Sequence, residues 1–154
     1  AEPGIKIQSV YLSQPPDFSG FGDPAKGKTT AEGMFDKGAD VVYHAAGGSG
    51  GGLFEAASAA KKWAIGVDSD QGLTADSSVQ GSILTSMLKN IDVAVFDYLK
   101  TVESGTPKTG AQIYDLKVDG VGYSTTGGNV DDIADQLNDY KEKIVSGEIT
   151  VPSS

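Results

Sequence analysis

Two aspartates, Asp68 and Asp70, follow a short apolar run and are separated by one residue. Paired carboxylates can exchange protons, ligate a metal ion or accept hydrogen bonds from ligand hydroxyl groups. Either aspartate could instead cap a helix or a turn. A metal ion would need further ligands, and the chain contains no cysteine and only one histidine, His44. We therefore expect no metal site and no thiolate chemistry.

The single histidine lies in the apolar stretch 39–46. Histidine is the usual general base near neutral pH, but a histidine inside a buried strand is more often a core residue. Ser49 has no histidine after it in the sequence, which does not favour a Ser-His-Asp arrangement. We expect no catalytic residue. The alternative is that the chain is an enzyme or sensor lobe with a doubly wound α/β fold that uses Asp68 and Asp70.

Five glycines and one serine form the segment Gly47–Gly52, which leads into an alanine-rich stretch that favours a helix. Glycines let a ligand approach the backbone, and the start of a helix offers free N–H groups at the positive end of its dipole. Gly48, Ser49 and Gly50 are therefore candidate ligand-binding residues. The segment lacks the lysine of a Walker motif and follows the second expected strand, which weakens a dinucleotide-binding interpretation. A purely structural turn is the alternative.

Two aromatic side chains, Phe18 and Phe21, lie in a loop beside glycines. A ring on a loop can stack on a flat ligand, or it can fold back and cover the edge of the sheet. Asp23 is followed by Pro24 and is predicted to cap a helix, because proline is well tolerated at the first helical position.

The chain has 154 residues and a formal net charge of -9. This length suits a single domain, 1–154, and the acidic charge without a run of Lys or Arg argues against nucleic-acid binding.

No apolar stretch approaches the roughly 20 residues that cross a bilayer. The first residues lack the features of a signal peptide, so we expect a chain that is already processed or cut from a longer one.

Alternating strand and helix signals predict the elements that position these residues. Strands are expected at 5–12, 39–46 and 63–68, with helices at about 24–37 and 53–60 between them. This order predicts an α/β fold with a parallel sheet. Open sheets of this kind bind ligands at the carboxyl ends of their strands.

Three more elements are predicted in the second half of the chain. Apolar residues at helical spacing predict a long amphipathic helix at about 85–104. Residues 112–123 are predicted to form strand with a turn at Asp119–Gly120, and residues 130–146 a last helix.

Several motifs together resemble the basic membrane protein family of purine nucleoside receptors. Their order and spacing both fit, and the resemblance covers nearly the whole chain. The motifs are Phe21–Gly27, Gly38–Tyr43, Ala46–Gly52, Ile65–Gln71, Leu84–Lys89 and Gly147–Pro152. The resemblance implies a parallel-sheet, three-layer lobe of a type I periplasmic binding protein, which is flavodoxin-like or Rossmann-like. This chain resembles the second lobe only.

The resemblance also implies a function. Members are solute-binding components of ABC importers, usually extracytoplasmic membrane-anchored lipoproteins, that close on a purine nucleoside between two α/β lobes and use no cofactor. By this likeness Phe21 would stack on the base, the glycine loop would donate backbone N–H groups, and Asp68 with Lys89 would bind the ribose hydroxyls. Asp23 is expected at the same site. Gly22 stands where the family often has a larger polar residue.

The expected partners are a purine nucleoside or related small molecule, a transporter permease and the first lobe, which these residues do not include. By analogy, the helix at about 85–104 would pack on that lobe. We expect its apolar stripe to be uncovered in the isolated chain and to cause self-association or repacking.

Overall fold

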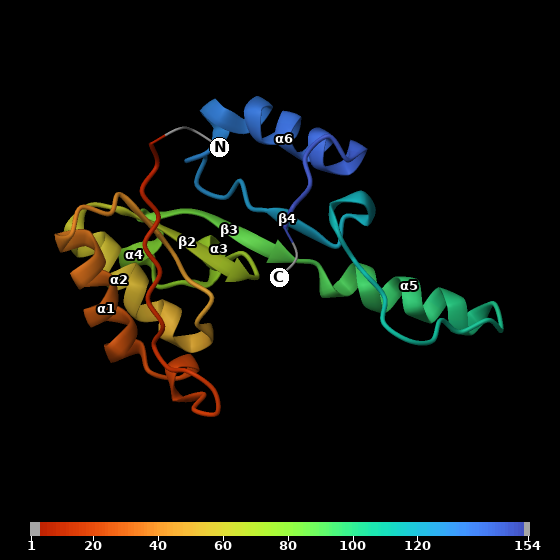
Figure 1. Ribbon diagram of the computed structural model, residues 1–154, viewed down its shortest axis with the longest axis horizontal. Helices are drawn as coiled ribbons and strands as arrows, with labels where there is room; N and C mark the ends of the chain where they lie inside the picture. The colour runs from red at the N-terminus through yellow and green to blue at the C-terminus, as the bar shows by residue number, and fades with distance from the viewer. Residues whose placement is uncertain (1–3, 153–154) are drawn as a thin grey trace.

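The computed structural model describes residues 4–152 and contains a four-stranded sheet with helices on both sides (Figure 1). The strands are β1 (Val41–Tyr43), β2 (Trp63–Asp68), β3 (Ile83–Lys89) and β4 (Val121–Tyr123). They lie in the order β1-β2-β3-β4. The first three run parallel, and β4 pairs antiparallel with β3. The α/β fold predicted from the sequence is confirmed.

The helices cover the two sides of the sheet unequally. Figure 1 shows α1 and α2 on one side and α6 on the other. The α-helices are α1 (Pro24–Asp36), α2 (Gly50–Ala60), α3 (Gln71–Thr74), α4 (Ser77–Gln80), α5 (Ile91–Glu103) and α6 (Ala134–Ser146). The short 3-10 helices are η1 (Ser19–Phe21), η2 (Gly47–Ser49), η3 (Leu116–Val118) and η4 (Asp131–Ile133).

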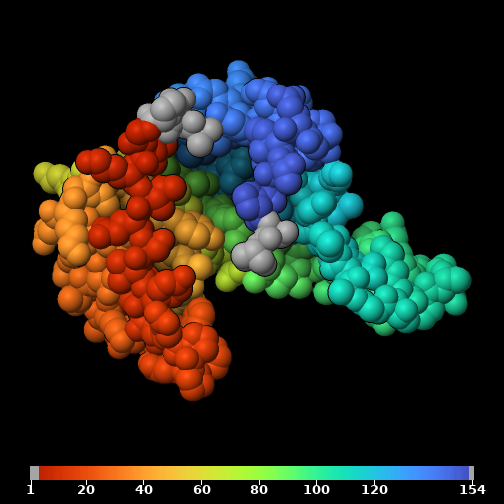
Figure 2. Space-filling view, in the orientation of Figure 1, coloured from red at the N-terminus to blue at the C-terminus, as the bar shows by residue number. Residues whose placement is uncertain are grey.

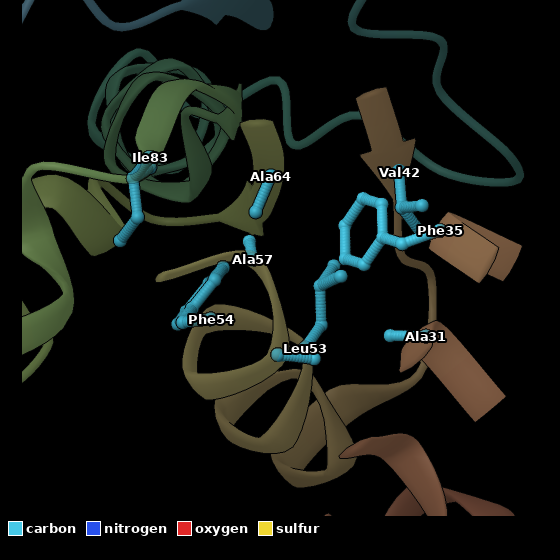
Figure 3. Close-up of a cluster of buried hydrophobic side chains, with 9 residues drawn as sticks. Ala31, Phe35, Val42, Leu53, Phe54, Ala57, Ala64 and Ile83 are labelled. Carbon is cyan, nitrogen blue, oxygen red and sulfur yellow. The ribbon is translucent and has the colours of Figure 1, made fainter. Parts of the chain in front are cut away.

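The hydrophobic core lies between the sheet and the helix pair α1 and α2 (Figure 3). Its members are Ala31, Phe35, Val42, Leu53, Phe54, Ala56, Ala57, Ala64 and Ile83, all of them buried. Burial of apolar surface is worth about 25 cal/mol per Å². The core therefore anchors β1 and β2, and their carboxyl ends carry the glycine loop and Asp68.

Two glycines let α1 and α2 approach closely. A Cβ atom on Gly27 would overlap the carbonyl oxygen of Ser49, and one on Gly52 would overlap the carbonyl oxygen of Pro24. Both helices begin at this contact. The glycines therefore fix where the two helix starts lie relative to each other.

Several predicted elements are confirmed closely. Helix α1 begins after Asp23, whose Oδ1 accepts a hydrogen bond from the backbone N–H of Lys26 at 2.9 Å. Strand β2 has the predicted bounds, 63–68, and the strand expected at 39–46 is present as the shorter β1. The last predicted helix is present as η4 and α6.

The strand predicted at 5–12 is not formed. Its residues make no backbone hydrogen bond to any other described residue, and β1 is an edge strand. Ile5 and Ile7 remain 67% and 88% exposed. Alternating apolar residues favour a strand only where a neighbouring strand and a core receive them, and neither is present here.

The helix predicted at about 85–104 is wrong in its first part. Residues 83–89 form β3, and the helix, α5, begins only at Ile91. Strand β3 pairs on both sides, with β2 and with β4. These pairings satisfy its backbone and override the helical spacing of its apolar residues.

The strand predicted at 112–123 is also mostly absent. Only the last three residues form β4, after the 3-10 helix η3. The predicted turn is present, because Asp119 adopts a left-handed conformation with φ of 53°. Gly120 packs so closely on the backbone of Tyr114 that a Cβ atom would overlap it.

Helix α5 has no buried residue and projects from the rest of the molecule (Figure 2). Its exposed large apolar side chains are Ile91, Val95, Phe96, Tyr98, Leu99 and Val102. The helix is tied to the following segment through Asp97, which accepts hydrogen bonds from Lys108 at 2.6 Å and from Tyr114 at 2.8 Å. The bond from Lys108 also lowers the pKa of Asp97.

Between residues 4 and 152, no helix combines the length and the apolar character that a bilayer crossing requires.

Candidate functional site

The carboxyl ends of the parallel strands carry most of the predicted site residues. The glycine loop follows β1, Asp68 is the last residue of β2, and Lys89 is the last residue of β3. Because parallel strands end at the same edge of a sheet, these groups share one side of the lobe.

Asp68 and Lys89 form an ion pair across the ends of β2 and β3. Lys89 Nζ lies 2.7 Å from Asp68 Oδ1, and both side chains are about half exposed. Asp68 has a left-handed backbone with φ of 68°, a conformation that aspartate and asparagine adopt more readily than most residues. The structure thus brings together the two groups predicted to bind ribose.

Phe21 lies against the glycine loop. A Cβ atom on Gly47 would be 3.4 Å from Cδ1 of Phe21, and Gly47 itself has a φ of +52°. The Phe21 ring is 53% exposed, and its centroid lies 6.5 Å from that of Phe18. Phe21 has therefore not folded into the core, and about half of its surface is open to solvent.

Ser49 is only 1% exposed. Its Oγ donates to the carbonyl oxygen of Gly20 at 2.6 Å and accepts from the backbone N–H of Asp23 at 2.9 Å. The hydroxyl therefore joins the glycine loop to the segment before α1. This is a structural role that the sequence did not reveal, and a ligand contact by Ser49 stays a prediction.

The other predicted residues near this loop are Gly48, Gly50 and Asp23, and they differ in their surroundings. Gly50 is buried, and a Cβ atom there would overlap the ring of His44. Gly48 is exposed and lines a cavity of about 670 Å³. The carboxylate of Asp23 caps α1 through the N–H of Lys26, as described above. Gly48 is exposed, Asp23 is half-buried and Gly50 is buried.

The cavity beside the glycine loop lies between α2 and the short helices α3 and α4. Its lining residues are Pro24, Gly47, Gly48, Gly51, Phe54, Glu55, Gln71, Thr74, Ala75, Asp76, Ser78 and Val79. Phe21, Asp68 and Lys89 do not line it. These three lie outside this cavity and are each about half exposed.

Asp70 is held by two hydroxyl groups that sequence reasoning missed. Its Oδ2 accepts from Ser124 Oγ at 2.8 Å and from Thr126 Oγ1 at 2.6 Å. These residues follow β4, far away in the sequence, and no local signal identifies them. Asp70 therefore joins two loops, and it does not form a free carboxylate pair with Asp68.

His44 is 7% exposed and forms part of a buried polar cluster. Its Nε2 lies 3.0 Å from Oε1 of Gln71, a residue that the sequence did not single out. Burial lowers the pKa of His44 below its usual value of 6.5, although the hydrogen bond to Gln71 and the charge of Asp68 act in the opposite direction. A core position was the expected alternative to a general base, and the structure places His44 there.

The residues from 4 to 152 contain no cluster of three or more His, Cys, Asp or Glu side chains arranged to hold a metal ion. A second cavity, of about 500 Å³, lies between β4 and the end of α6. None of the predicted site residues lines it.

This fold, with its loops at the carboxyl edge, is similar to about half of a solved ABC solute-binding protein. The chain is similar to an ABC transporter solute-binding protein from Aeropyrum pernix K1, with a TM-score of 0.69 and 29% identity. The match covers 87% of this chain and 46% of that protein.

The chain belongs to the Bmp family, described as ABC transporter substrate-binding protein PnrA-like, which matches residues 1–154. It is 38% identical to the CD4+ T-cell-stimulating antigen of Listeria monocytogenes serovar 1/2a (strain ATCC BAA-679 / EGD-e). It is 36% identical to the ABC transporter nucleoside-binding protein BmpA of Lactococcus lactis subsp. cremoris (strain MG1363). Each match covers 97% of this chain but only 44% of the relative's length. The family predicted from the motifs is confirmed.

Proposed function

We propose that this chain supplies half of the ligand site of an ABC importer's solute-binding protein and that the ligand is a purine nucleoside. The observation that carries the proposal is the half-exposed Asp68–Lys89 pair at the ends of β2 and β3. The substrate-binding description of the family supports the role. The nucleoside-binding name of the Lactococcus relative supports the class of ligand.

The ion pair suits the two neighbouring hydroxyl groups of a ribose. Each hydroxyl can donate one hydrogen bond and accept others. The carboxylate of Asp68 accepts, and the ammonium group of Lys89 donates. Because the two charges neutralise each other, a neutral sugar can bind between the lobes without leaving a net buried charge.

The aromatic ring of Phe21 and the exposed backbone of Gly48 suit the base. A purine is flat and stacks on an aromatic face, while its ring nitrogens accept from backbone N–H groups. Gly47 and Gly48 have no side chain that would keep a ligand away from the loop.

Binding is proposed to occur without chemistry. Asp70 is engaged by Ser124 and Thr126, so the Asp68 and Asp70 carboxylates do not act together as an acid–base pair. In the complete protein, ligand burial between two lobes favours the closed state, which then docks on a permease. An extracytoplasmic, lipid-anchored location belongs to the same proposal.

Helix α5 is proposed to contact the part of the complete protein that these residues do not include. Its apolar side chains are exposed along the whole helix. A continuous apolar stripe of this kind marks an interaction surface in soluble proteins.

Calorimetric titration of the complete protein with inosine and guanosine tests the proposal. We expect binding without turnover, and Asp68→Asn and Lys89→Met should each weaken it about tenfold to a hundredfold, as expected for loss of a charged hydrogen-bond partner. Asparagine retains the left-handed conformation of position 68.

The matched control is Lys62→Met. Lys62 pairs with Asp40 at 2.6 Å, but these residues lie at the amino ends of β2 and β1, on the opposite edge of the sheet. Affinity should be unchanged in this variant. Product formation, or equal losses in Lys62→Met and Lys89→Met, would contradict the proposal.

A further inference from the structure

The side chain and backbone of Gln71 contact all three parallel strands: the residue just after β1, the carboxyl end of β2 and the middle of β3. Its Oε1 accepts a hydrogen bond from the backbone N–H of Val67 in β2 at 2.8 Å and lies 3.0 Å from Nε2 of His44, just after β1. The backbone N–H of Gln71 donates to Oγ of Ser86 in β3 at 3.1 Å. Ser86 is completely buried.

These contacts select one state of the His44 ring. The N–H of Val67 requires an acceptor, so the oxygen of the Gln71 amide must face it. An amide oxygen only accepts, and Nε2 of His44 must therefore carry the hydrogen that is donated to it. The other ring nitrogen, Nδ1, is then an acceptor, and the N–H of Ala46 points at it from 3.4 Å.

The cluster is closely packed on the sides that face β2 and the start of α2. A Cβ atom on Gly66 would lie 2.8 Å from Oε1 of Gln71 and 2.7 Å from Oγ of Ser86. A Cβ atom on Gly50 would overlap the His44 ring. The amide of Gln71 is thus held in place from the β2 side, and the ring that it contacts is held by the first turn of α2.

We propose that Gln71 is a positioning residue for the ligand site: it holds the end of β2 next to Asp68 through the N–H of Val67, and the start of the glycine loop through His44. The inference rests on the proposed function only for the identity of the ligand. Two loops that are already fixed lose little freedom when a ligand binds, which favours affinity. Gln71 itself is not required to touch the ligand.

The test compares Gln71→Met with Gln80→Met in the unliganded chain. Gln80 is also a half-buried glutamine on a short helix, and its amide donates to the carbonyl oxygen of Ala75 at 3.0 Å. NMR of the His44 ring nitrogens reports the tautomer, and hydrogen exchange reports the N–H groups of Ala46 and Val67. We expect the Nε2–H tautomer in the original chain and in Gln80→Met.

In Gln71→Met we expect a mixture of tautomers and exchange of the Ala46 and Val67 amides that is about tenfold faster, because their acceptor network is lost. Gln71→Glu keeps the acceptor oxygen, so the hydrogen on Nε2 and the slow exchange should return. An unchanged ring and unchanged exchange in Gln71→Met would overturn the inference. If Gln71→Met does not fold, a predominant Nδ1–H tautomer in the original chain would overturn it instead.

An inosine titration of the complete protein separates this inference from the proposed function. Weaker binding in Gln71→Met, with normal binding in Gln80→Met, supports the positioning role, and equal binding in both contradicts it. If the original protein does not bind inosine or guanosine, the proposed function fails, while the ring tautomer and the exchange rates still decide whether Gln71 fixes the loops.

Discussion

At the scale of single residues, some polar groups at the strand ends form hydrogen bonds within the protein, and others remain exposed to solvent. Ser49, Asp70 and His44 are engaged by protein partners. The side chains of Asp68 and Lys89 are half exposed, and within residues 4–152 they pair with each other. The residue types alone did not separate these groups, because the partners come from loops that are distant in the sequence.

Ser49→Ala should destabilise the fold by about 1–3 kcal/mol, since it leaves the carbonyl oxygen of Gly20 and the N–H of Asp23 without their partner. Urea denaturation measures this loss. The control is Ser58→Ala, because Ser58 makes only a long contact of 3.4 Å to the carbonyl oxygen of Ser78. A change within about 0.5 kcal/mol is expected for it. Equal effects of the two changes would contradict the structural role of Ser49.

Stability should also depend on the charge of His44. Burial lowers its pKa in the folded state below the usual value of 6.5, so the unfolded chain binds a proton first as the pH falls. The stability contributed by the neutral ring is fully present above pH 6.5 and is lost as the pH falls below it.

Urea denaturation at about pH 7.5 and about pH 5.5 measures this effect of His44, and the chain has no other histidine that titrates in the range. The His44→Asn variant should be less stable than the original chain at both pH values. It should lose less stability than the original chain when the pH is lowered from about 7.5 to about 5.5. If both proteins lose the same amount of unfolding free energy as the pH falls, His44 is not the cause of that pH dependence.

At the scale of elements, the sequence predicted well those that pack on the core. Helix α1 and strand β2 have clear boundaries in the sequence, a capping aspartate and an apolar run, and both are found as predicted. The errors lie where tertiary context decides. Residues 83–89 have helical spacing but form a strand between two others, and residues 5–12 have strand character but no strand beside them.

The glycine loop allows a direct test of element packing. Gly50→Ala should destabilise the fold by about 1–3 kcal/mol, because the added methyl group overlaps the His44 ring. Gly51 also lies in α2 but has open space around its Cβ position. Gly51→Ala should therefore be neutral or stabilise the helix by up to about 1 kcal/mol. Thermal unfolding of both variants measures the difference, and a reversed order would contradict the packing described.

At the scale of the whole molecule, the chain is unevenly packed. The half that contains α1, α2 and the first three strands has a common core, whereas α5 and α6 contain no buried residue. The chain matches 44% of the length of its relatives, which is consistent with a surface that another part of the complete protein covers.

The isolated chain should associate through α5. Val95 and Leu99 are 52% and 56% exposed and lie one turn apart on this helix. Sedimentation should show concentration-dependent association that the double change Val95→Lys with Leu99→Lys abolishes. Glu103→Lys adds positive charge at the end of the same helix and should leave association intact. A monomer at all concentrations would contradict the prediction.

We propose that Phe21, Gly47, Gly48, Asp68 and Lys89 lie on one ligand-binding surface. This proposal is tested most directly by NMR of this labelled chain with inosine at high concentration, because half of a site binds weakly. We expect the amide signals of these five residues to shift together, while those of Asp40 and Lys62 at the opposite edge do not. Shifts confined to the opposite edge, or to the apolar surface of α5, would contradict it.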